Sequence, residues 1–298
     1  MAVQTRHLVH QLPVIASLGG TAFAALRQRL GGSPPRTPVV PGPELRATVP
    51  PLPKELLKDY IRHTGGDPSS YGGVVPPHLF PQWGFPLGAR TLRDLPYPLA
   101  KVLNGGCRLE IRGDLPAGQP LQVAARLEDI DDNGRRAVLK QRITTGTAEA
   151  PELVVGTLFA IVPLGGQRGG GEKPAPARVP ADAVELAYWR LSADAGLAFA
   201  MLTGDFNPVH WVPAYARAFG FRNTILHGFS TMARAIEGLN RGRFAGDPRR
   251  LTVFDCKFTR PLVLPARVGL YLRGQEVWVG DAPGGPAYLA GTFQTRDQ

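Results

Sequence analysis

A short segment occurs twice in this chain, and the two copies are separated by half of its length. The run Cys107-Arg-Leu-Glu-Ile-Arg-Gly-Asp-Leu-Pro-Ala lies 149 residues before Cys256-Lys-Phe-Thr-Arg-Pro-Leu-Val-Leu-Pro-Ala in a chain of 298 residues. A second pair of segments, Thr64-Gly-Gly-Asp-Pro and Thr203-Gly-Asp-Phe-Asn-Pro, occurs in the same order, with a small insertion or deletion. Because similarity at a fixed spacing indicates a repeated structural unit, the chain is predicted to contain two copies of one fold.

Hydrophobic periodicity predicts both strands and a helix within these copies. Apolar residues alternate with more polar ones over residues 121–127 and 268–272, which is typical of half-buried strands. Over residues 229–239 the apolar residues recur at helical spacing and predict an amphipathic helix with a buried face. Each copy therefore reads as a loop and helix followed by antiparallel strands, and the predicted fold class is α+β.

Proline and glycine mark the predicted boundaries between the units. The chain contains 30 prolines and 36 glycines, concentrated in a Pro-rich stretch at residues 33–53 and a Gly/Pro-rich run at 165–180. These runs predict four segments: an N-terminal extension (1–54), a first domain (55–164), a linker (165–180) and a second domain (181–298).

Composition excludes several classes of function. The net charge is +10, but the arginines are dispersed and form no long basic run or zinc-finger spacing, so nucleic acid is not the predicted partner. The two cysteines form no CxxC motif, which argues against a disulfide scaffold or a zinc ribbon and favours a reducing compartment. No stretch of about 18 apolar residues is present, so no membrane span is expected.

The N-terminus leaves the compartment open. Residues 12–26 form an apolar run after Arg6 and His7, and the first acidic residue is Glu44, as in a weak signal peptide or an organellar presequence. The alternative is a docking helix interrupted by Gly19 and Gly20. We favour the docking helix and a cytoplasmic location, with an organellar or exported protein as the alternative.

The densest group of chemically useful residues lies in the second half. Asp205, Asn207 and His210 fall within six residues, beside Pro208. A tight turn can direct a carboxylate, an amide and an imidazole at one small volume, and a carboxylate and a histidine around one water make a general acid/base pair. The alternative is that Asp205 and Asn207 only cap a turn.

The pattern Gly-Asp-x-Asn-Pro-x-His at 204–210, with the later His227-Gly228 before a predicted helix, resembles the signature of the MaoC-like family of R-specific enoyl-CoA hydratases and dehydratases. The resemblance implies a double hotdog, with two antiparallel sheets that each wrap a central helix. The N-terminal half is then degenerate, because Asp67 is not followed by the Asn, and Gly72 stands where the His is expected. That half would supply a wall of an acyl tunnel.

The resemblance also implies roles for individual residues. Asp205 and His210 would activate a water that adds across the C2=C3 bond of a trans-2-enoyl thioester, and Asn207 would orient this pair. Gly228 would offer its backbone N–H to the thioester oxygen, which suits the positive end of a helix dipole. The alternative is that Gly228 only allows the chain to enter the helix and has no catalytic role. The product would be an (R)-3-hydroxyacyl thioester, and the reverse dehydration is equally allowed.

Three further residues are weaker candidates for substrate binding. His227 either shapes the site or is a packed or capping histidine, while Lys257 and Arg260 either meet substrate phosphates or are solvated surface charges. No metal is expected, because the His and Asp spacing fits neither HExxH nor a closed zinc pattern, and no cofactor is implied. The predicted partner is an enoyl-CoA or acyl-carrier-protein thioester, and the predicted protein is a monomer or homodimer. The alternative function is a non-catalytic acyl-thioester-binding or scaffold subunit.

Overall fold

A computed structural model describes residues 5–12, 14–15, 37–99, 102–165 and 175–296. The elements of the first half, after the short helix η1 (Thr5–Gln11), are β1 (Leu45–Val49), α2 (Lys54–Thr64), η2 (Pro68–Tyr71), η3 (Pro77–Leu79), α3 (Pro81–Thr91), β2 (Leu103–Ile111), β3 (Leu121–Asp132), β4 (Arg136–Gly146) and β5 (Val154–Pro163). Those of the second half are β6 (Val184–Leu191), α4 (Ala195–Thr203), η5 (Pro208–His210), α5 (Pro213–Ala218), α6 (Gly228–Gly242), η6 (Pro248–Arg250), β7 (Leu251–Phe258), β8 (Ala266–Arg273), β9 (Glu276–Gly280) and β10 (Ala287–Thr295).

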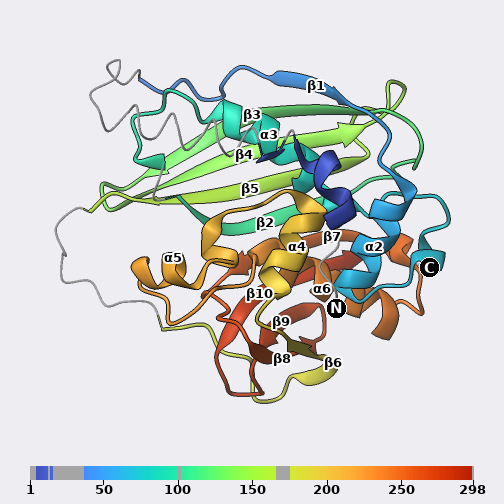
Figure 1. Ribbon diagram of the computed structural model, residues 1–298, viewed down its shortest axis with the longest axis vertical. Coiled ribbons are helices and arrows are strands. Elements are labelled where there is room, and N and C mark those ends of the chain that lie inside the picture. The colour runs from blue at the N-terminus through green and yellow to red at the C-terminus, as the bar shows by residue number, and fades with distance from the viewer. Residues whose placement is uncertain (1–4, 13, 16–36, 100–101, 166–174, 297–298) are drawn as a thin grey trace.

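The strands of the described residues form one antiparallel ten-stranded sheet in the order β1-β3-β4-β5-β2-β7-β10-β9-β8-β6. Within each half the first strand, counted along the chain, pairs with the third and the second with the fifth, so the two halves repeat one topology. The two predicted sheets are thus present, and β2 and β7 join them edge to edge (Figure 1). This arrangement confirms the predicted α+β double hotdog.

The repeat found in the sequence lies at the junction between the halves. Cys107 of β2 faces Cys256 of β7 in the antiparallel register, and both side chains are buried. Two equivalent strands that pair antiparallel with equivalent residues opposite each other are related by a local two-fold axis through that pair. The duplication is therefore expressed as a pseudo-symmetric interface within one chain.

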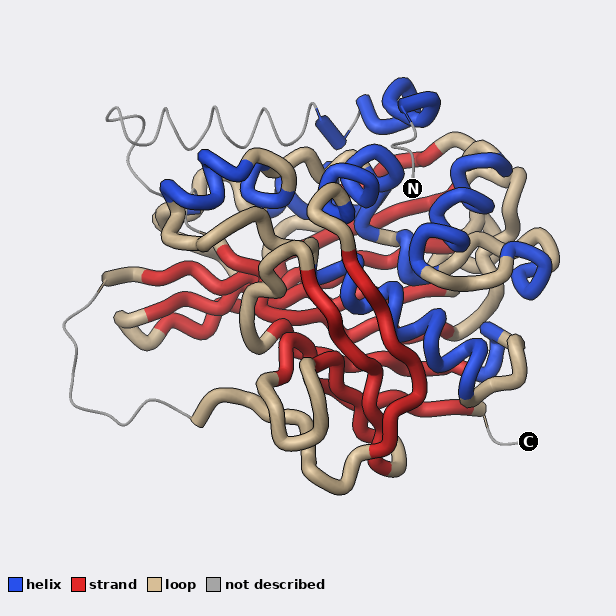
Figure 2. The backbone as a smooth tube through the Cα atoms, turned by 60° about the horizontal axis from the view of Figure 1, so that its bottom comes forward, coloured by secondary structure: helices blue, strands red, loops and turns tan. Residues whose placement is uncertain are grey.

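The helices gather on one side of the sheet, and the main core lies between them and the strands (Figure 2). The helix predicted at residues 229–239 is α6, and its apolar residues Phe229, Met232, Ala233, Ile236 and Leu239 are all buried. The strand predicted at residues 121–127 is part of β3, whose buried positions alternate with half-buried ones. Both periodicity predictions are confirmed.

In β8 the predicted alternation is less clear, because Gly269 and Tyr271 are buried as well as Val268 and Leu270. A second apolar cluster, which includes Tyr271, Trp278 and Val179, covers the other face of the sheet here. A strand that is buried on both faces loses the two-residue period.

The predicted domain boundaries stay a prediction. β1 falls within the predicted extension 1–54, yet it pairs with β3 and forms the outer edge of the first half. Most of the run 12–26 and residues 166–174 of the linker lie outside the described residues. Among the described residues, no helix has both the length and the apolar character that crossing a bilayer requires.

Candidate functional site

The residues of the Gly-Asp-x-Asn-Pro-x-His pattern lie in the loop between α4 and α5. Helix α4 ends at Thr203 because Gly204 adopts a left-handed conformation, with φ of 80°, and its N–H closes the last turn on the Ala200 carbonyl. The chain then turns sharply through Asp205 and enters η5, which ends at His210. This turn directs Asp205 and His210 towards the N-terminus of α6.

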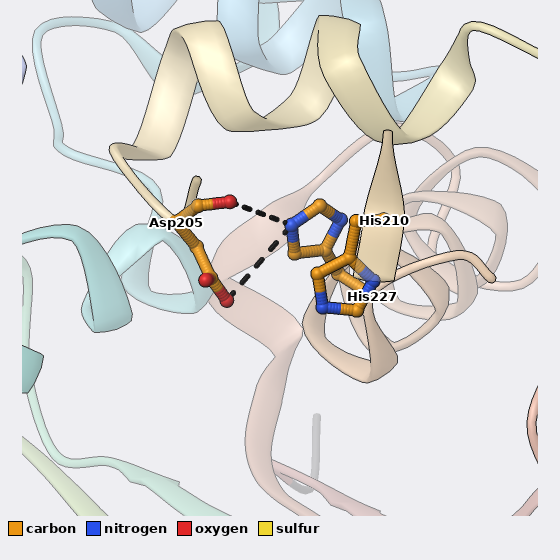
Figure 3. Close-up of side chains that lie close together, drawn as sticks. All are labelled: Asp205, His210 and His227. Carbon is orange, nitrogen blue, oxygen red and sulfur yellow. Dashed lines mark hydrogen bonds and ion pairs between the residues drawn. The ribbon is translucent and has the colours of Figure 1, made fainter. Parts of the chain in front are cut away.

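The imidazole rings of His210 and His227 stack on each other, with centroids 3.6 Å apart and planes inclined by 25° (Figure 3). His210 Nδ1 lies 2.8 Å from the Ile225 carbonyl, and His227 Nε2 lies 2.9 Å from the Asp205 carbonyl. Since a carbonyl only accepts hydrogen bonds, each of these ring nitrogens carries the proton. In neutral His210 the other nitrogen, Nε2, is then a free acceptor and can act as a base.

Both histidines are held neutral by their surroundings. Burial lowers the pKa of His210 below its usual value, and the nearby Asp205 carboxylate only partly opposes this effect. Burial, with the neighbouring His210 as a smaller cause, lowers the pKa of His227 to about 3. A general base must be unprotonated at the working pH, so the lowered pKa of His210 suits that role.

Asp205 and Asn207 also stabilise the turn. The Asp205 carboxylate accepts a hydrogen bond from the Asn207 N–H at 3.4 Å, and the Asn207 side chain accepts one from the Val209 N–H at 3.3 Å. Asn207 thus caps η5 and holds the backbone that carries His210. Asp205 keeps 22% of its side chain exposed and can still reach a bound molecule.

Gly228 is the first residue of α6, where a backbone N–H has no acceptor within the helix. A Cβ atom at this position would lie 2.8 Å from the Phe258 ring, closer than a real contact allows. The glycine therefore lets the Phe258 ring pack directly on the start of α6. An oxyanion placed here would meet the positive end of the helix dipole.

Asp205, His210 and His227 bring their ligand atoms within 4.8 Å of one another, a spacing that a metal ion can bridge. The hydrogen bonds described above fit such a site poorly. His227 Nε2 carries a proton and donates a hydrogen bond to the Asp205 carbonyl, so this nitrogen has no lone pair left for a metal ion. We therefore derive no metal-dependent step.

Two predicted binding residues lie apart from this group. Lys257 is exposed on β7. Its neighbour Phe258 packs on the start of α6, and because successive strand residues point to opposite faces, the Lys257 side chain points away from α6. Arg260 follows β7, is exposed, and lies near Tyr288. The structure does not bring either cation to Asp205 and His210.

The first half repeats the geometry of this loop with different residues. Helix α2 ends at Thr64 with Gly65 in the left-handed conformation, as α4 ends at Thr203. Asp67 then caps η2 through the Ser69 N–H, and η2 ends at Tyr71. Asp67 thus takes the place of Asn207 rather than that of Asp205, and Tyr71 takes the place of His210. The first half therefore has no Asp and no His at the positions of Asp205 and His210.

A cavity of about 200 Å³ lies on the first-half side of this loop, and its lining is mostly apolar. The lining residues come from α3, β4, β5, the segment around β2, and the N-terminal segment through Val14. Phe85 of this lining contacts the ring of Phe229 on α6, with centroids 5.2 Å apart. His78 and Trp83, which precede Phe85 of this lining in the sequence, are buried in the core.

The second half of the chain is similar to a known protein family. Residues 177–282 match the family described as MaoC like domain. The chain is 28% identical over 166 residues to a probable enoyl-CoA hydratase 2 of Dictyostelium discoideum, which covers 53% of this chain and 56% of that protein. The aligned region spans about half, or less, of the curated relatives that it matches.

Solved structures support the fold over most of the chain. HtdX of Mycobacterium tuberculosis is 21% identical and superposes with a TM-score of 0.68, covering 85% of this chain and all of that one. A second protein of Mycobacterium tuberculosis, described as having a double hotdog fold, is 14% identical with a TM-score of 0.55, covering 89% of this chain and 99% of that one. At this level of identity the likeness establishes the fold.

Proposed function

We propose that this protein, which carries a MaoC-like dehydratase domain over residues 177–282, hydrates trans-2-enoyl thioesters to (R)-3-hydroxyacyl thioesters or catalyses the reverse dehydration. The observation that carries the proposal is the free Nε2 of neutral His210 beside the Asp205 carboxylate and the N-terminus of α6. The relative named as a probable enoyl-CoA hydratase 2 supports the same reaction.

In the proposed reaction, Asp205 and His210 hold one water between them. His210 Nε2 takes a proton from this water while its oxygen bonds to C3 of the enoyl group. The Asp205 carboxylate accepts a hydrogen bond from the other hydrogen of the water, which stays on the oxygen, and stabilises the imidazolium that forms. The proton then passes from His210 to C2, so that one water has added across the double bond and both side chains return to their initial state.

The second requirement of this reaction is a place for the negative charge that develops on the thioester oxygen. We assign this role to the Gly228 N–H, which lies at the positive end of the fifteen-residue helix α6. Asn207 acts indirectly, because its capping hydrogen bond fixes the turn that carries His210. We propose His227 as a positioning residue that fixes the Asp205 backbone and supports the His210 ring.

The substrate class is an acyl thioester carried by coenzyme A or by an acyl-carrier protein. The apolar cavity lies next to the loop and suits an aliphatic chain. Lys257 and Arg260 stay candidates for contact with more distant phosphates, since neither lies with the Asp205 and His210 group.

The test is the loss of enoyl-thioester absorbance when the purified protein meets crotonyl-CoA, with chiral analysis of the hydroxyacyl product. Asp205→Asn and His210→Gln should each lower the rate by about 10²–10⁴-fold. Asp182→Asn is the matched control, because its side chain is 68% exposed and pairs only with Arg273 among the described residues. Binding of acyl-CoA without turnover by the unchanged protein would instead favour a non-catalytic acyl-thioester-binding subunit.

A further inference from the structure

The described residues of the N-terminal segment, 5–12 and 14–15, pack against both halves of the protein. In η1, His7 and Gln11 are buried. His7 Nε2 lies 2.7 Å from the Asp59 carboxylate of α2, and Arg6 also donates to this carboxylate. Burial alone would raise the pKa of Asp59, but the hydrogen bonds from Arg6 and His7 outweigh it and lower that pKa below its usual value. A charged Asp59 therefore holds the start of the segment on α2.

Gln11 ties the segment to the candidate site. Its Nε2 donates to the Leu202 carbonyl of α4 at 2.9 Å, and its Oε1 accepts from Gln82 Nε2 of α3 at 3.2 Å. Gln11 is fully buried, so both contacts are made away from solvent. The Gln11 side chain thus connects α4 to α3 of the first half. Helix α4 precedes residues 204–212, which we call the catalytic loop because they include Asp205 and His210.

Val14 lies against the loop itself. A Cβ atom at Gly204 would be 2.7 Å from Val14 Cβ, so the valine packs directly on the backbone before Asp205. The same valine lines the apolar cavity opposite α3 and is 2% exposed. Val14 therefore stands between the catalytic loop and the cavity.

Two aromatic residues also lie between the start of α6 and the cavity. Phe85 of α3 lines the cavity and contacts Phe229, which directly follows Gly228. Val14 and Phe85 thus line one cavity, and each contacts a residue next to the candidate site, Gly204 for Val14 and Phe229 for Phe85. Val102 and Leu103 of the same lining are exposed, with 39% and 56% of their surface accessible.

We propose that Val14, held in place by Gln11, is a specificity-determining residue that sets which acyl chains pass from the catalytic loop into the apolar cavity. This inference rests on the proposed function, which supplies the acyl thioester. It gives the N-terminal segment a direct part in substrate selection, although that segment lies about 190 residues before the catalytic loop.

The test compares trans-2-decenoyl-CoA with crotonyl-CoA, whose short chain does not need the cavity. Val14→Trp should lower the ratio of kcat/KM for the long substrate over the short one by at least about tenfold. Leu12→Trp is the matched control, since Leu12 lies in the same segment with 59% of its surface exposed, and it should leave the ratio unchanged.

A second variant in the lining of the cavity keeps the inference testable if Val14→Trp does not fold. Ala89→Trp, on α3, narrows the same cavity and should shift the ratio in the same direction. An unchanged ratio in the folded variants, or a wild-type enzyme that hydrates crotonyl-CoA but not decenoyl-CoA, overturns the inference and leaves the proposed function standing.

Failure of the proposed function would look different, because neither substrate would then be hydrated. In that case the affinities of decanoyl-CoA and butyryl-CoA, measured by calorimetry, decide the inference without turnover. A decanoyl-CoA preference that Val14→Trp abolishes supports the role of Val14, and equal affinities reject it.

Discussion

Tyr71 of the first half donates its hydroxyl to the Glu237 carboxylate of α6 over 2.7 Å, and both side chains are buried. Asn240 donates to the second carboxylate oxygen at 3.2 Å. Tyr71 ends η2 as His210 ends η5, so the position that carries the proposed base in the second half carries, in the first, a hydrogen bond to the other half. In the first half this position therefore serves a contact that links the two halves.

Tyr71→Phe should destabilise the protein by about 1–3 kcal/mol, because the buried Glu237 carboxylate loses a donor. Urea unfolding measures this change, with Tyr188→Phe as the control on a tyrosine that is 47% exposed. In the double variant Tyr71→Phe/Glu237→Gln, the costs of the two changes should not add. Strict additivity would mean that the hydrogen bond carries no coupling energy.

The activity should rise with pH and reach a plateau in the neutral range. In the proposed reaction His210 acts as a base, which requires its neutral form, and burial lowers its pKa below the usual value of 6.5. The pH profile of kcat/KM should therefore show an acid limb with an apparent pKa below 6.5. His210→Gln should remove this limb from the residual activity. An acid limb centred above pH 7 would contradict the assignment.

Protein stability should fall as the pH drops below about 6.5. Burial lowers the pKa of His63 in the folded state to about 3, so between these values the unfolded chain binds the extra proton. The stability that comes from neutral His63 is complete above pH 6.5 and is lost towards pH 3.

Comparison with a His63→Gln variant isolates this contribution. The substitution should reduce the slope of unfolding free energy against pH by up to about 1.4 kcal/mol per pH unit in this window. His10→Gln, at an exposed position of η1, serves as the control and should keep the wild-type slope. Equal slopes for all three proteins would show that His63 titrates normally.

Gly228→Ala should lower both stability and turnover. Its Cβ would lie 2.8 Å from the Phe258 ring, and relief of such overpacking costs about 1–3 kcal/mol. Shifting the start of α6 would also displace the N–H that we place at the thioester oxygen. The double variant Gly228→Ala/Phe258→Leu provides the missing room and should recover most of the thermal stability. A Gly228→Ala variant with wild-type stability and rate would contradict the close packing.

The two thiols should be unreactive in the native protein. Burial raises the pKa of both Cys107 and Cys256, so neither forms the thiolate that reacts with disulfide reagents. A thiol assay with Ellman's reagent should detect no fast reaction before unfolding and two thiols in guanidinium chloride. Fast native labelling would show that the junction between β2 and β7 opens readily.

Sequence reasoning succeeds here where the information is local or repeated. The burial period over residues 121–127 identifies a strand of the sheet, the helical period identifies α6, and the Cys107 and Cys256 segments identify the duplication. The closeness of Asp205 and His210 also follows from a turn of six residues.

Contacts between distant segments were not predictable in this way. Gln11 bonds to the Leu202 carbonyl and Val14 packs on Gly204, although nothing in the N-terminal sequence specifies these partners. The placement of Asp67 also needed the structure, because its Asp-Pro pair matches Asn207-Pro208 only when both are seen to cap a short helix. The charge of Lys257 makes it a candidate for phosphate binding, but charge does not indicate on which face of a strand a side chain lies.

The register that places Cys107 opposite Cys256 has a consequence for how a duplicated chain of this kind can arise. A single-copy ancestor with the same strand at its edge would have joined a second copy through that strand, as a homodimer with two identical sites. Once both copies lie on one polypeptide, the association is intramolecular and no longer depends on protein concentration. Each copy then accumulates its own substitutions, so one can keep the chemistry while the other is reshaped for binding, a division of labour that an identical pair of subunits cannot achieve.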